Sequence, residues 1–379
     1  MKIVHICLGN FYVEGMGYQE NIITKMHAKE GHNVYVLTSD FAFNGKGEAI
    51  KKDKIEYVNE FGVKVKVLDR SNDFFARYGK FVGLFNELQN LKPDIVFVHC
   101  GNFISLNDVI KYCKKTGCTM YIDQHSDYYN CALTTLKKKI VFKGLFRYYM
   151  RKAVPYTTKF WGVTPWRCEF LRDVFKIPQE KIDLLIMGGD DDKIDFEKAP
   201  EIRKEIRKQL NFSENDFVVT TGGKIDRAKN FHLLMQAVAE LEGKVKLIVF
   251  GSPNAEMQDE ITELSKNENI RFLDWIPSDK VYDYFFASDL CVFPGTHSVL
   301  WEQACACGIP SFFKYWKGMQ HVKVNGNAEF LYNDSKEEIK EKIADLCSNK
   351  EKYSEMKKAA EKCKKEFIYS EISRKAIGQ

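Results

Sequence analysis

The sequence predicts an α/β protein made of two successive domains, each built on a buried parallel β-sheet. Short apolar runs rich in β-branched residues alternate with helical patterns through both halves of the chain, which is typical of parallel sheets covered by helices. The chain has 379 residues, and domains of about 100–200 residues make two the expected number. A charged stretch at 190–212 carries no strand pattern and separates the two alternating regions.

The first half alternates strand and helix patterns in order. Apolar runs predict strands at 3–8, 33–37, 63–68, 95–98, 120–122, 160–163 and 184–187. Helical spacing of apolar residues predicts helices at 17–29, 81–91, 109–115 and 165–175, the last with a proline at an early position.

The second half repeats this alternation. Its predicted strands are 217–221, 245–250, 270–273, 290–293 and 311–313. Its predicted helices are 231–241, 256–266, 280–287 and 301–307, followed by two polar helices at 335–366. Ligands of open parallel sheets bind at the carboxyl ends of the strands, so the loops after the strands are the candidate sites.

Composition excludes several classes of protein. The apolar run at the N-terminus is too short for a signal peptide, and no continuous apolar stretch is long enough to span a membrane, so we expect a cytosolic chain. The eleven cysteines form no CxxC pair and are expected to be reduced, buried thiols. The net charge of +5 is mild, and no recognition motif indicates a nucleic-acid partner.

The loop after the first strand of the second half is a candidate phosphate site. The strand ends in Gly222 and Gly223, basic residues follow at Lys224, Arg227 and Lys229, and then a helix begins. Glycine lets the backbone approach a phosphate, and a helix N-terminus adds partial positive charge. The two lysines can neutralise a departing diphosphate. The alternative interpretation is a solvated basic turn.

A second candidate loop follows the strand at 290–293. It consists of His297, Ser298, Val299 and Leu300. Glu302 lies in the first turn of the next helix, where a carboxylate can accept both hydroxyls of a ribose. It would also complement the helix dipole without any ligand, so both interpretations stay open.

These two loops carry a resemblance to a known family. The second half resembles the donor domain of the retaining glycosyltransferases of family 4, which have the GT-B fold. The Gly-Arg…Lys-Gly/Asn element of that family is matched by Gly223-Lys224 and Lys229-Asn230, and its Glu-Ala-x-Ala-x-Gly-x-Pro helix by 302–310. The resemblance covers most of the second half and, more weakly, the first.

The resemblance implies two Rossmann-like domains that face each other across a cleft. Residues 1–192 would bind the acceptor, residues 193–360 would bind the donor, and a C-terminal helix at about 360–379 would cross back onto the first domain. It also implies a UDP- or GDP-sugar donor, retention of anomeric configuration, and no metal or other cofactor.

Three features depart from the family pattern. Only the second of the two family glutamates is present, as Glu302, and Pro294 stands eight positions before it. The loop between them is shortened, so His297 could partly replace the missing donor-sugar contacts. The family arginine is Lys224, which keeps the charge and loses the planar fork.

The first half offers further candidates at its strand ends. Gly15 and Gly17 follow the first strand and resemble the family loop that approaches the donor phosphate, although an ordinary turn would have the same composition. His125 resembles the family histidine that contacts the sugar. His99 would line the acceptor side or satisfy a local hydrogen bond, and Asp127 could act as a base on the acceptor hydroxyl.

Two charged segments allow alternative interpretations. The acidic triplet at 190–192 could hold a divalent metal but is expected to be a turn and linker. Residues 136–152 contain seven basic residues and no acidic ones, interleaved with aromatic and aliphatic residues. That pattern fits either a helix on an anionic membrane surface or an ordinary amphipathic helix.

We therefore expect a metal-independent glycosyltransferase that moves a sugar onto a hydroxyl of a glycan or lipid-linked acceptor, in synthesis of surface polysaccharide or glycoconjugates. It would act in the cytoplasm or at the inner face of the membrane. Trp275 could stack on the nucleotide base. The alternatives are an epimerase or phosphorylase on the same architecture, or a nucleotide-sugar binder without activity.

Overall fold

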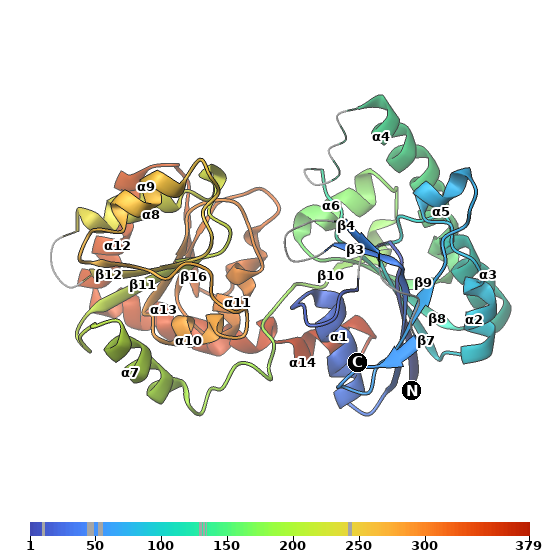
Figure 1. Cartoon of the computed structure of the whole chain (residues 1–379), viewed down its shortest axis with the longest axis horizontal. Helices are drawn as coiled ribbons and strands as arrows, with labels where there is room; N and C mark the ends of the chain where they lie inside the picture. Colours follow the sequence, from blue (N-terminus) through green and yellow to red (C-terminus); the bar gives the residue numbers. More distant parts are fainter. Residues whose placement is uncertain are drawn as a thin grey trace. The chain divides into compact units, whose positions relative to one another are not determined.

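The computed structural model describes residues 1–9, 12–43, 49–51, 56–128, 131, 133, 135–241 and 245–379. They form two compact units, one of Met1–Ile186 with Ile372–Gln379 and one of Met187–Glu371. Each unit contains a largely parallel sheet with helices against it (Figure 1). No helix among these residues is long and apolar enough to cross a membrane.

The first unit is built on an eight-stranded sheet with the strand order β10-β9-β8-β7-β1-β2-β6-β5. Its strands are β1 Lys2–Cys7, β2 Asn33–Ser39, β5 Glu56–Val58, β6 Lys64–Leu68, β7 Ile95–His99, β8 Thr119–Gln124, β9 Thr157–Gly162 and β10 Ile182–Leu184. Only β5 is antiparallel to its neighbour. A separate antiparallel pair, β3 Phe41–Phe43 and β4 Ala49–Lys51, and the strand β5 were not expected from the sequence pattern.

The helices of the first unit are α1 Gln19–Lys29, α2 Leu84–Leu91, α3 Leu106–Thr116, α4 Leu136–Ile140, α5 Arg147–Ala153 and α6 Pro165–Asp173. Helices α2, α3 and α5 contribute to the main apolar core on one side of the sheet. The predicted helix at 81–91 begins only at Leu84, because Gly83 before it has φ 80°, which is left-handed and not helical. A π-helical segment, Val141–Phe146, joins α4 to α5 within the basic stretch.

The second unit is built on a six-stranded, fully parallel sheet with the order β13-β12-β11-β14-β15-β16. Its strands are β11 Phe217–Gly222, β12 Val245–Phe250, β13 Ile270–Phe272, β14 Leu290–Phe293, β15 Ser311–Lys314 and β16 Ala328–Leu331. The strand order reverses between β11 and β14. That reversal is the point at which doubly wound sheets bind ligands.

The helices of the second unit are α7 Ala199–Gln209, α8 Phe231–Ala239, α9 Gln258–Leu264, α10 Val281–Phe286, α11 Leu300–Ala306, α12 Lys336–Ser348 and α13 Lys350–Cys363. Figure 1 shows α8, α9 and α12 gathered on one side of the sheet. Helix α7 lies inside the charged stretch at 190–212, where no helix was predicted. It is held by Arg207, a fully buried side chain whose Nη2 donates to Asp289 Oδ2 at 2.6 Å.

The boundaries between the units differ from the predicted ones. The predicted boundary after residue 192 lies inside the second unit, which begins at Met187. The reason is that the Gly189 N–H donates to Phe367 O at 2.8 Å and the Asp190 N–H to the Tyr282 hydroxyl at 3.0 Å. The chain returns to the first unit at Ile372 rather than near residue 360.

The last helix, α14 Tyr369–Ala376, ends against the first unit. The Trp161 indole N–H donates to Ala376 O at 3.1 Å, and the Tyr121 hydroxyl donates to Ile377 O at 3.0 Å. The last carbonyls of a helix have no partner within the helix. Buried side chains of the sheet therefore complete the hydrogen bonding of this helix end.

Candidate functional site

The two loops that follow β11 and β14 lie side by side in the second unit. The Thr296 N–H donates to Ala228 O at 3.0 Å, and Asn230 Nδ2 donates to Pro294 O at 3.2 Å. A Cβ on Gly295 would overlap the backbone at residues 228–229, so glycine is required at this crossing. The loops predicted to hold phosphate and ribose are thus held together at the switch point of the sheet.

Glycine is also required where the first of these loops leaves β11. Gly223 has φ 122° and Gly251, after β12, has φ 133°, conformations that residues with a side chain rarely adopt. A Cβ on Gly251 would overlap Gly223 O. The backbones of the loops after β11 and β12 therefore approach each other more closely than a residue with a side chain at position 251 would allow.

Of the two predicted lysines, Lys229 is the one whose ammonium group lies between the two loops. Its Nζ donates to Thr296 O at 2.5 Å and to His297 O at 3.1 Å, which orients the ammonium group between the loops. Burial lowers the pKa of Lys229 to about 8. Lys224, by contrast, has a side chain that is 74% exposed, with its Nζ 3.9 Å from Asp226 Oδ2.

Glu302 is fully buried and is held by two histidines. His297 Nε2 and His321 Nε2 each lie 2.8 Å from the same oxygen, Oε1. Burial alone would raise the pKa of Glu302, but the two imidazoles outweigh it and lower the pKa to about 2. The second oxygen, Oε2, is buried and has no hydrogen-bond partner among the described residues.

His321 was not predicted from the sequence. It lies in a short 3₁₀ turn, Gln320–Val322, nineteen positions after Glu302, and no motif surrounds it. The contact exists only in the folded chain.

The remaining predicted residues of the second unit differ in how close they come to this cluster. Ser298 O accepts from the Trp301 N–H at 3.0 Å, Val299 is the N-cap residue of α11, and the Leu300 side chain packs toward Gly223. Trp275 is 68% exposed in the loop after β13. Within the described part of the chain, its side chain makes no hydrogen bond or ring contact with the other predicted residues, so its stacking role stays a prediction.

The first unit gathers a second group of polar side chains at the carboxyl end of β8. His125 Nε2 lies 3.4 Å from Asp123 Oδ2, and the interaction with Asp123 raises the pKa of His125 although burial lowers it. Asp127 is buried, and its Oδ2 lies 3.3 Å from Arg167 Nη2. Asp127 thus faces a guanidinium group, and its role as a base on the acceptor hydroxyl stays a prediction.

The predicted glycine loop of the first unit is open. Gly15 has φ 76°, and no atom of another described residue lies within 4 Å of the position that a Cβ would take on Gly15 or Gly17. The left-handed backbone conformation explains why a glycine stands at position 15. Close packing explains the glycine at neither position. Approach to a phosphate stays a prediction for this loop.

Among the residues that the structure describes, two groups of side chains have the composition of a metal site, and neither was predicted. In each, the ligand atoms lie within 4.8 Å of one another; they are His99, Asp123 and His125 in the first unit, and His297, Glu302 and His321 in the second. In the first group both Asp123 oxygens are already engaged, Oδ1 by the Cys100 N–H at 3.0 Å and Oδ2 by His99 at 2.7 Å. Hydrogen bonds therefore account for that group.

The acidic triplet forms a turn. Asp190 Oδ1 accepts from the Asp192 N–H at 3.3 Å, and Asp191 Oδ1 accepts from the Ser370 N–H at 3.0 Å. These bonds fit the predicted turn between the two halves of the chain.

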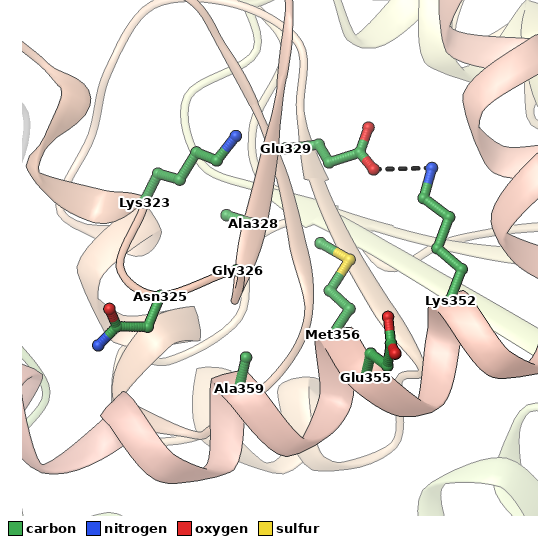
Figure 2. Close-up of a pocket in the computed structure, with 9 residues that line it drawn as sticks. All are labelled: Lys323, Asn325, Gly326, Ala328, Glu329, Lys352, Glu355, Met356 and Ala359. Carbon is green, nitrogen blue, oxygen red and sulfur yellow. Dashed lines mark ion pairs between the residues drawn. The ribbon is translucent and has the colours of Figure 1, made fainter.

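A separate cavity of about 350 Å³ lies between β16 and α13 (Figure 2). Lys323, Asn325 and Gly326 line it from the segment that precedes β16, so it lies at the amino end of that strand, opposite the edge that carries the candidate loops. Lys352 Nζ and Glu329 Oε1 pair across it at 2.8 Å. Its charges are balanced, and it is not part of the candidate site.

Comparison with solved structures identifies the fold as GT-B. Anabaena HepE in complex with UDP and glucose aligns with a TM-score of 0.64 and 15% identity, over 99% of this chain and 98% of that chain. A glycosyltransferase of Rickettsia africae gives a TM-score of 0.71 and 14% identity, over 99% and 96% of the two chains. WaaG, a glycosyltransferase involved in lipopolysaccharide biosynthesis, gives 0.64 and 16%, over 99% and 98%. The predicted fold class is confirmed.

The family to which the chain is similar in sequence is indicated mainly by the second unit. Residues 202–363 match the family model described as glycosyl transferases group 1. The D-inositol 3-phosphate glycosyltransferase 1 of Catenulispora acidiphila is 29% identical over 128 residues, and the match covers 29% of this chain and 31% of that protein. The chain thus matches about a third of the length of this curated relative.

Proposed function

We propose that this chain is a retaining glycosyltransferase of family 4 that uses a UDP- or GDP-sugar. The observation that carries the proposal is the joining of the two loops at the switch point of the second sheet, with Lys229 oriented by backbone carbonyls and Glu302 held by two imidazoles. The match of residues 202–363 to glycosyl transferases group 1 supports it. The UDP bound in Anabaena HepE favours UDP over GDP.

In the proposed reaction, Lys229 stabilises the diphosphate as it leaves. An ammonium group with a pKa of about 8 is largely charged at neutral pH, and a developing phosphate charge would hold its proton more firmly. Lys224 adds a second, more mobile positive charge beside the first. The free oxygen Oε2 of Glu302 would accept a ribose hydroxyl, because a buried carboxylate oxygen without a partner favours a donor group.

His125 would contact the donor sugar from the first unit. Transfer would take place without a metal and with attack from the face that the diphosphate leaves, which retains the anomeric configuration. The acceptor would be a hydroxyl of a glycan or lipid-linked sugar, in surface polysaccharide or glycoconjugate synthesis at the cytoplasmic face of the membrane. The role of WaaG in lipopolysaccharide biosynthesis supports that choice of pathway.

The basic stretch of the first unit would dock on an anionic membrane. In α4, Leu136 is 74% and Ile140 61% exposed, and three lysines lie between them. Residues four apart share one helix face, so an apolar edge is flanked by positive charge, as in helices that lie on membranes. Binding to vesicles with anionic lipid, lost in the double variant L136S/I140S, would support docking; equal binding of both proteins would contradict it.

Donor and acceptor can be tested separately. Thermal-shift measurements with UDP- and GDP-sugars should give a stabilising shift with one nucleotide, and release of free nucleotide only with an acceptor glycan would distinguish transfer from epimerisation or binding alone. Lys229→Ala should lower turnover at least about 100-fold, while Lys266→Ala, an exposed lysine of the same unit, should not. Full activity of Lys229→Ala would remove that residue from the mechanism.

A further inference from the structure

A continuous series of buried contacts connects three histidines of the first unit, which we call the histidine ladder. His27 Nδ1 of α1 lies 3.0 Å from His5 Nε2 of β1, and His5 Nδ1 lies 3.0 Å from His99 Nε2 of β7. At one end, His27 Nε2 lies 2.8 Å from Ser373 O. At the other, His99 Nδ1 lies 2.7 Å from Asp123 Oδ2. All three imidazoles and Asp123 are 0% exposed.

The chemistry of these groups fixes the number of protons in the ladder. Ser373 presents a carbonyl oxygen and Asp123 a carboxylate oxygen, and both only accept. Each of the four contacts needs one proton on a ring nitrogen, but three neutral imidazoles bring only three. The ladder therefore holds one proton more than three neutral rings, and the Asp123 carboxylate balances the resulting positive charge.

That positive charge rests at the Asp123 end. Burial and the neighbouring imidazoles lower the pKa of His5 far below its ordinary value, and burial lowers the pKa of His27 to about 4. Burial alone would raise the pKa of Asp123, but His99 and His125 outweigh it and hold the pKa well below its usual range. The Phe97 ring packs on His5 and His99 at 5.5 and 4.8 Å between centroids and separates them from water.

The ladder shares its counter-ion with the candidate site. His125 Nε2 lies 3.4 Å from the same Asp123 oxygen that His99 contacts. Two positive imidazoles would then face one carboxylate oxygen. Among the described residues, Glu20 of α1 raises the pKa of His125 and Arg167 of α6 lowers it.

We propose that the histidine ladder sets the protonation state of His125 by competing with it for the Asp123 carboxylate. While His99 carries the extra proton, the shared oxygen already faces one positive imidazole, so His125 takes up a second positive charge there less readily. Burial disfavours a charged His5 or His27, so the charge stays on His99. The role of this competition in catalysis rests on the proposed function, in which His125 contacts the donor sugar; the three ladder histidines are positioning residues.

Nitrogen NMR of the histidine-labelled protein tests the proton count directly. The chain has eight histidines, so each signal can be assigned by substitution. In the folded protein, His99 should have protons on both ring nitrogens, and His5 and His27 on Nε2 alone. A His99 with a proton on one ring nitrogen only would overturn the proposal.

Removing the middle of the ladder tests the competition. His5→Phe leaves His99 and His27 neutral, so Asp123 then faces His125 uncompensated and the pKa of His125 should rise by about one unit. His32→Phe is the matched control, since its ring lies 6.0 Å from that of His27 but outside the ladder. If His5→Phe does not fold, His5→Leu, which likewise offers no acceptor to His99 Nε2, replaces it.

An unchanged His125 titration in a folded variant would overturn the competition for Asp123. The acidic limb of the kcat profile separates this proposal from the proposed function. If the pKa of His125 moves by NMR and the limb moves with it, both stand. If the pKa moves and the limb does not, the competition stands and His125 has no part in the transfer.

Discussion

Replacing Glu302 with glutamine should destabilise the second unit in a way that depends on pH. The pKa of Glu302 is about 2 in the folded protein against an ordinary value of 4.5. Because the folded pKa is the lower one, the carboxylate contributes stability above about pH 4.5 and loses it as the pH falls toward 2. The shift of about 2.5 pH units corresponds to about 3 kcal/mol at neutral pH.

Glutamine keeps the shape of the side chain but cannot carry the charge that the two imidazoles stabilise. We therefore expect Glu302→Gln to unfold about 3 kcal/mol more easily than the natural chain at pH 7, and about 1.4 kcal/mol more easily near pH 3. The two units could unfold separately, so the measurement must report on the second one alone. Urea unfolding followed by pulsed hydrogen exchange and mass spectrometry of Leu300–Ala306 does so.

The control is Glu263→Gln, a carboxylate whose side chain is 73% exposed and pairs only with Lys266 among the described residues. It should change stability by less than about 0.5 kcal/mol at either pH. A Glu302→Gln difference that is the same at both pH values would show that the imidazoles do not act through its charge.

Three further outcomes follow from the second unit. Donor affinity should fall above about pH 8 as Lys229 loses its proton, and Lys229→Arg, which stays charged, should lose that dependence; isothermal titration between pH 6.5 and 9.5 measures both. Gly251→Ala should cost about 2 kcal/mol or more in urea unfolding, because its Cβ would overlap Gly223 O; a neutral effect would contradict the close approach. Arg207→Met should cost about 3 kcal/mol by the same method, since it leaves the Asp289 carboxylate facing only its other partners, and restoration in Arg207→Met/Asp289→Leu would show that the lost charge is responsible.

The sheets and the donor loops were predictable because their signals are local. Buried parallel strands leave short apolar runs, and the loop from Gly223 to Lys229 has its glycine and basic residues next to one another in the sequence. Helix α7 was not predictable in this way. Most of its residues are charged, and the hydrogen bond that holds it joins Arg207 to Asp289, which lies 82 positions further along the chain. The strand β16 has the sequence Ala-Glu-Phe-Leu, with a glutamate and no β-branched residue, so it lacks the apolar run that marks the other strands.

The environment of the site residues depends on contacts between distant segments. His321 reaches Glu302 because a 3₁₀ turn brings it there, and no spacing rule connects the two. His5 and His99 are separated by 94 positions and meet because β1 and β7 are neighbours in the sheet. Sequence patterns could place a histidine at the end of a strand, but they could not count the protons around it.

The way the chain ends has a practical consequence for anyone who wishes to study the first unit in isolation. A fragment cut after Ile186 would lack residues 372–379, and the indole of Trp161, the phenol of Tyr121 and the imidazole of His27 would lose the carbonyls to which they donate. The surface that these last eight residues cover would then be exposed to water. A soluble version would have to carry the last eight residues through a linker, or receive them as a synthetic peptide.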